Sequence, residues 1–86
     1  MTTITTLSAV AFATPALSSS RERLVRAADN LWRVHGAGMR ILGHLRLTVT
    51  PAGVRYRAER LHAASGIFRL VGEFWSPDDA VAALRH

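Results

Sequence analysis

The strongest constraint on the fold is a two-residue alternation of apolar and polar side chains over residues 39–50. The even positions are mostly polar, and the odd positions hold Met39, Ile41, Gly43, Leu45, Leu47 and Val49. Because successive side chains of a strand point to opposite faces of a sheet, this pattern predicts a strand with one apolar and one solvated face. Such a strand is typical of an antiparallel sheet that is covered on one side.

The same alternation recurs on both sides of this segment. Residues 50–53, "TPAG", have the proline and glycine of a turn, and residues 54–61 alternate again, which predicts a hairpin. Residues 31–35, "LWRVH", alternate before the "GAG" of a turn, and residues 67–75 form a further expected strand, with Phe68, Leu70 and Phe74 inward. We therefore expect an antiparallel meander of three or four strands.

A C-terminal helix is expected from the stretch "SPDDAVAAL". Ser76 is a favourable N-cap, Pro77 occupies the first helical position, and Asp78 and Asp79 lie where carboxylates favour the helix dipole. Val81 and Leu84 give the helix a narrow apolar stripe with which it can pack on one face of the sheet. The fold class is therefore α+β, with most of the buried area expected from Trp32, Tyr56, Phe68, Phe74 and Trp75.

The N-terminal part differs in composition from the rest. The first twenty residues contain no charged side chain, and we interpret residues 1–18 as a disordered tail and residues 19–86 as a single small domain. Ser19 and Glu22 have the spacing of a capping box, so we expect a short helix over residues 19–30, with an extended lead-in as the alternative. The apolar run in the tail is too short to span a bilayer, and we expect a cytoplasmic protein.

Residues that carry enzymatic chemistry are scarce. The chain has no cysteine, and its four histidines lack metal-ligand spacing, so we expect no metal site. The acidic residues are largely accounted for by helix caps, which leaves no convergent acid, base and nucleophile. We therefore predict a protein without catalytic residues or a cofactor.

The charge pattern indicates a partner. Eleven basic residues, all of them arginine, stand against six acidic ones. GC-rich coding accounts for the missing lysine but not for the excess of positive charge. The polar face of the expected sheet would carry Arg33, Arg40, Arg46, Arg55 and Arg57. These side chains suit salt-sensitive binding to the phosphates of a nucleic acid, whereas a solvated face kept soluble by charge is the alternative.

One sequence resemblance supports the first interpretation. "VGEFWSPDDAVAAL", at residues 71–84, resembles the end of small DNA-binding domains of the AP2 and integrase arm-binding type, in which a capped helix follows three antiparallel strands. The resemblance implies a sheet that binds DNA. The pattern "LWRV", "GHL", "VRYRA" and "GEFWS" is also similar to short actinobacterial proteins. In this chain, Trp32 and Tyr56 fall on the apolar face, which departs from the AP2-like use of strand aromatics.

A second functional hypothesis is a protein-interaction or dimerisation module. Strict alternation places four apolar residues on the nominally polar side of the sheet: Leu42, Leu61, Ile67 and Trp75. Such residues could form a docking patch. A continuous basic surface would favour nucleic acid, and an apolar centre with a basic rim would favour a protein partner.

Overall fold

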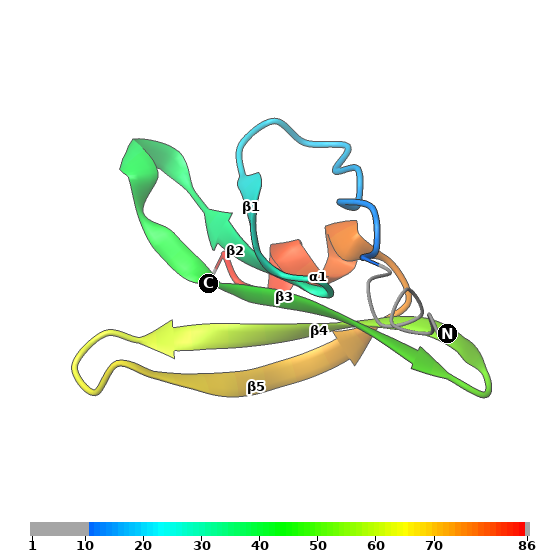
Figure 1. Ribbon diagram of the computed structural model, residues 1–86. Helices are drawn as coiled ribbons and strands as arrows, with labels where there is room; N and C mark the ends of the chain where they lie inside the picture. The colour runs from blue at the N-terminus through cyan, green and yellow to red at the C-terminus, as the bar shows by residue number, and fades with distance from the viewer. Residues whose placement is uncertain (1–10, 86) are drawn as a thin grey trace, which may run out of the picture.

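The computed structural model describes residues 11–85, which form a five-stranded antiparallel sheet and one α-helix (Figure 1). The strands follow one another in space as in sequence, so the sheet is a meander. In chain order the elements are β1 (Arg23–Ala28), β2 (Leu31–His35), the 3-10 turn η2 (Ala37–Met39), β3 (Ile41–Thr50), β4 (Gly53–His62), β5 (Ile67–Phe74) and α1 (Pro77–Ala83). The predicted α+β meander with a C-terminal helix is confirmed, but the sheet has five strands, not three or four.

The additional strand is β1, which occupies the segment where we expected a helix. Leu24 pairs with Val34 and Arg23 with His35, so this segment is the antiparallel neighbour of β2. Ser19 does not cap a helix: its Oγ accepts a hydrogen bond from the backbone N–H of Arg21, two residues away. The helix prediction was wrong because pairing with β2, a contact outside the segment, decides its conformation.

One face of the sheet carries the core. Trp32, Val34, Leu45 and Ala58 are fully buried there, and α1 adds Ala80, Val81 and Leu84. Figure 1 shows α1 and the segment 11–22 on the same side of the sheet. We call this surface the covered face.

The helix begins as the sequence predicts. Ser76 Oγ accepts a hydrogen bond from the backbone N–H of Asp79 at 3.1 Å, and Pro77 follows at the first helical position. The carboxylate of Asp78 accepts a hydrogen bond from the backbone N–H of Ser18 at 2.9 Å. The Ser76 cap therefore fixes the start of α1, and Asp78 in the first turn ties the chain that precedes β1 to the helix.

Residues 11–18 fall in the segment that we interpreted as a tail, and they contact the domain. Thr14 Oγ1 accepts a hydrogen bond from Trp32 Nε1 at 3.0 Å, and Leu17 packs against the core. Residues 1–10 of the expected tail lie outside the described residues. Between residues 11 and 85, no helix has the length and apolar character needed to cross a membrane.

An ion pair joins the residue that precedes β1 to the end of the described chain after α1. Glu22, which precedes β1, is buried, and its two carboxylate oxygens accept hydrogen bonds from Arg85, each at 2.9 Å. These hydrogen bonds lower the pKa of Glu22, against the opposing effect of its burial. The pair therefore ties the start of β1 to the end of α1.

Candidate nucleic-acid interface

The sheet surface opposite α1 is not covered by any other element between residues 11 and 85, and we call it the open face. It is built from the alternate side chains of all five strands, as the register of the sheet shows. The residues that define it are Arg23, Val25, Leu31, Arg33, His35, Ile41, His44, Arg46, Thr48, Arg55, Arg57, Glu59, Leu61, Phe68, Leu70, Glu73 and Trp75.

Four of the five arginines predicted for the site meet on this face. Arg33 lies opposite His44 in the β2–β3 pair, and Arg46 lies opposite Arg57 in the β3–β4 pair. Arg55 is two residues before Arg57 on β4 and therefore points the same way. The two-residue alternation of the sequence therefore correctly predicted that these four side chains share a face.

Arg40 lies elsewhere, and a β-bulge explains the difference. Val34 pairs with Gly43 and His35 pairs with Ile41, so one extra residue of β3, Leu42, stands between them. A bulge interrupts strict alternation. Leu42 accordingly packs against the core and does not join the open face.

The same bulge places Arg40 beside the helix. Arg40 lines a surface hollow together with Leu42, Leu84 and Arg85, at the C-terminal end of α1. Its guanidinium is thus separated by the sheet from the other four arginines. The prediction that Leu42 belongs to an apolar docking patch on the polar side was wrong for the same reason.

A second bulge changes which aromatic side chains are inward. Ala58 pairs with Gly72 and Glu59 pairs with Leu70, which leaves Val71 as the extra residue of β5. Tyr56 and Phe74 lie half-buried against the core, as predicted, whereas Phe68 and Leu70, which we expected inward, lie on the open face because of the bulge. Trp75 also lies there and is 60% exposed, so the prediction that it supplies buried area was wrong.

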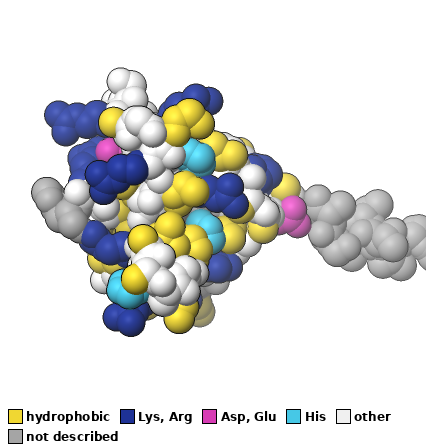
Figure 2. All heavy atoms as spheres, turned by 90° about the vertical axis from the view of Figure 1, so that its left-hand side faces the viewer, with side chains coloured by type: hydrophobic (Ala, Val, Ile, Leu, Met, Phe, Trp, Pro, Cys, Tyr) yellow, Lys and Arg dark blue, Asp and Glu magenta, His cyan; other side chains and the backbone are white. Residues whose placement is uncertain are grey.

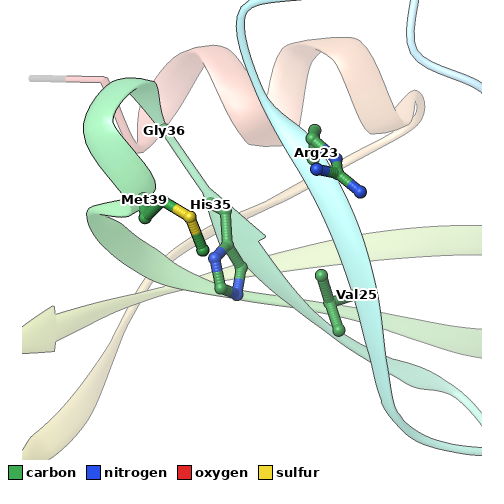
Figure 3. Close-up of a pocket in the computed structure, with 5 residues that line it drawn as sticks. All are labelled: Arg23, Val25, His35, Gly36 and Met39. Atoms are coloured by element: carbon green, nitrogen blue, oxygen red, sulfur yellow. The ribbon is translucent and has the colours of Figure 1, made fainter.

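Arg23 is a residue of the open face that the sequence did not indicate, because its segment was expected to be helical. It lines a hollow of about 180 Å³ with Val25, His35, Gly36 and Met39 at the β1–β2 edge. Figure 3 shows the Met39 side chain extending toward the His35 ring, with Val25 on the other side of the ring. The sequence of β1, RLVRAA, has no clear two-residue alternation, because Leu24 and Val25 are both apolar and only Leu24 is half-buried, so it carried little signal for the strand.

Two of the arginines are engaged in cross-strand ion pairs. Arg46 Nε lies 3.2 Å from a carboxylate oxygen of Glu59, and Arg57 Nε lies 3.5 Å from one of Glu73. Within the described part of the chain, Arg23, Arg33 and Arg55 have no ion-pair partner. The face thus carries five arginines against two glutamates, and three of its cations are not neutralised by a carboxylate.

Two aromatic contacts lie among these charges. The Arg55 guanidinium stacks over the Trp75 ring, 4.0 Å from its centroid, and donates a hydrogen bond to the backbone carbonyl of Glu73. The His44 and Phe68 rings are stacked, with centroids 3.8 Å apart and planes inclined by 7°. Trp75 is exposed in its contact, whereas His44 and Phe68 are half-buried in theirs.

His44 is the titratable group with a perturbed pKa on this face. Burial lowers its pKa, and the charges of Arg33 and Arg46 add to this effect, whereas Glu59 opposes it. The neutral form is therefore favoured at pH 7, as expected for a ring stacked on Phe68. Among residues 11–85, no cluster of three or more metal-ligating side chains exists.

The distribution of charge differs from both arrangements that we considered. Figure 2 shows arginine and histidine side chains interspersed with apolar ones at the end of the sheet that carries the β2–β3 and β4–β5 connections. The open face likewise alternates arginines with Leu61, Leu70 and Trp75, so it is neither a continuous basic surface nor an apolar centre with a basic rim.

Comparisons with known proteins reveal no relative of this chain. No family model, curated protein or solved structure matches the chain. The resemblance to AP2-type and actinobacterial sequences accordingly stays a prediction.

Proposed function

We propose that the protein is a non-enzymatic module that binds nucleic acid through the open face of its sheet. The observation that carries the proposal is the gathering of Arg23, Arg33, Arg46, Arg55 and Arg57 on one uncovered surface. Arginine donates hydrogen bonds to phosphate in a planar, bidentate geometry, and phosphate contacts supply most of the affinity of non-specific binding.

The excess of positive charge supports the same partner. The whole chain has a formal net charge of +5. A surface of this kind attracts a polyanion over a distance and loses that attraction as salt screens it. The proposed location is the cytoplasm, where nucleic acid is accessible.

The test is a fluorescence-anisotropy titration of labelled DNA, as duplex and as single strand, at about 50 mM and 200 mM salt. Arg33→Ala removes a free cation from the open face and should reduce the slope of log affinity against log salt by about 0.9 on duplex DNA or 0.7 on a single strand. Arg40→Ala is the matched control: it removes the same charge from an exposed residue on the other side of the sheet and should leave the slope unchanged.

Two results would contradict the proposal. The first is absence of binding at the lower salt concentration. The second is an equal loss of affinity in the Arg33→Ala and Arg40→Ala proteins, which would show that net charge and not the open face attracts the DNA.

A protein partner is the second candidate function, and a specific observation favours it. Leu70, Val71 and Trp75 are 51%, 41% and 60% exposed, and all three lie on or directly after β5, an edge strand of the sheet. Exposed apolar groups beside an unpaired strand edge suit self-association. Analytical ultracentrifugation tests this candidate. If it shows a concentration-dependent dimer and no DNA binding is found, the protein-partner function is favoured over nucleic-acid binding.

A further inference from the structure

We infer that the open face selects single-stranded over duplex nucleic acid, with bases stacked on Trp75 and on the Phe68–His44 pair. This inference rests on the proposed function and names the form of its ligand. It follows from the way in which flat aromatic rings, apolar side chains and arginines share one surface.

Trp75 offers the first stacking position. Its ring is 60% exposed although the Arg55 guanidinium covers part of it at 4.0 Å. The contact with Arg55 restrains the ring without burying it, so the side chain loses little conformational freedom when a base stacks on it. The neighbouring guanidinium is then in place for a phosphate of the same nucleotide.

The Phe68–His44 pair is the second position, and it is less open than Trp75, because both residues are half-buried and the His44 side chain is 15% exposed. The two rings are parallel within 7°, and the low pKa of His44 keeps the pair neutral. Trp75 directly follows β5 and is seven residues after Phe68, so the rise of a strand separates the two residues by about 20 Å. A strand of several nucleotides can therefore reach both positions, as in sheet surfaces that bind one base on each aromatic ring.

The side chains between these positions argue against a duplex. Leu70 is 51% exposed and lies between Phe68 and Glu73 on the same face. A duplex presents phosphates on its outside, so docking it here would press phosphates against apolar groups and remove their water without a compensating hydrogen bond. A single strand can turn its bases toward the apolar groups and its phosphates toward Arg33, which has no ion-pair partner among residues 11–85.

The experiment uses the intrinsic tryptophan fluorescence of the full chain. Trp32 is fully buried, so Trp75 is the tryptophan that a ligand can reach. Thymidine oligonucleotides of about fifteen residues, long enough for a sheet or barrel site of this size, should quench it, and a duplex of equal length should bind at least tenfold more weakly at the same salt concentration.

Two substitutions at the same position isolate stacking from folding. Trp75→Leu keeps an apolar side chain but removes the ring, and it should weaken single-strand binding by about 5- to 100-fold, the range for loss of one base–aromatic stack. Trp75→Phe should restore most of the affinity. Phe12→Ala is the control for loss of an exposed aromatic residue off the face, and it should bind as the unmodified protein does.

The outcomes separate this inference from the proposed function. Equal affinity for both forms of DNA, with the Arg33→Ala effect intact and no effect of Trp75→Leu, would overturn the single-strand inference and leave the proposed function standing. Absence of binding to either form would overturn both.

Discussion

The two faces of the sheet are made by the same strands but are stabilised in different ways. On the covered face, Val34 and Leu45 pack in one core with residues of α1, and Trp32 is buried beside the segment that holds Thr14. On the open face, cross-strand ion pairs and stacked rings hold side chains that no layer covers. Alternation along a strand thus encodes stability on one side of this sheet and leaves the other side free for the binding that we propose.

The difference lies in what each contact contributes to the free energy of unfolding. Burial of apolar area drives folding, whereas exposed ion pairs of the Arg57–Glu73 kind contribute little. The open face is therefore free to vary without loss of the fold. The predictions below test this separation, beginning with the largest expected effect.

Truncating one leucine on each face compares the two directly. Leu84 is 2% exposed and packs in the core, whereas Leu70 is 51% exposed on β5. Leu84→Ala should lower the free energy of unfolding by about 2–5 kcal/mol, because it removes buried methyl groups and leaves a cavity. Leu70→Ala should change it by no more than about 0.5 kcal/mol.

Urea denaturation followed by circular dichroism measures both values. Similar shifts of the two midpoints would contradict the separation, since they would mean that the open face is also part of the core. An unchanged midpoint for Leu84→Ala would show that α1 is not docked.

The glycine of β3 gives a second comparison. A Cβ added at Gly43 would overlap the backbone carbonyl oxygen of Glu59 on the neighbouring strand. Because a backbone atom cannot move without shifting the β3–β4 pair, Gly43→Ala should cost about 1–3 kcal/mol. Gly36→Ala is the control, because its Cβ would approach the flexible side chain of Leu42 at 3.2 Å, and it should cost less. Equal midpoints of the two variants in urea would contradict the close approach of β3 and β4.

Much of the fold could be predicted from local sequence, and the exceptions have a common cause. The hairpin, the last strand and the capped helix follow from alternation and from the Ser76–Pro77 signal. β1 was missed for two reasons. Its residues are mostly exposed, and the helix-like spacing of Ser19 and Glu22, just before the strand, is outweighed by the pairing of β1 with β2. An edge strand with little burial leaves a weak pattern in its own sequence.

The candidate site was predictable to the extent that alternation holds. Arg33, Arg46, Arg55 and Arg57 lie where the two-residue period places them. The bulges at Leu42 and Val71 reverse the faces beyond them, which removes Arg40 from the set and brings Phe68 into it. A bulge depends on how two strands pair, so it cannot be predicted from the sequence of either strand alone.

The smallest expected effect is the pH dependence of stability, in which the two faces again differ. The pKa of Glu22, on the covered face, lies below its ordinary value of 4.5 because Arg85 donates hydrogen bonds to its carboxylate. The unfolded chain therefore takes up this proton first as the pH falls. The stabilisation from Glu22 should be complete above about pH 4.5 and decline below it.

His44, on the open face, should act at a higher pH. Its pKa lies below the ordinary value of 6.5, chiefly because of burial, so the unfolded chain binds the proton at a pH where the folded chain does not. Stability should be complete above about pH 6.5 and fall as the pH drops toward 5. Urea midpoints measured between pH 8 and pH 5 should show this decline in the unmodified protein and a smaller one in His44→Gln, whereas Glu22→Gln should retain it. A decline that persists in His44→Gln would mean that the stacked ring on the open face is not the group that titrates.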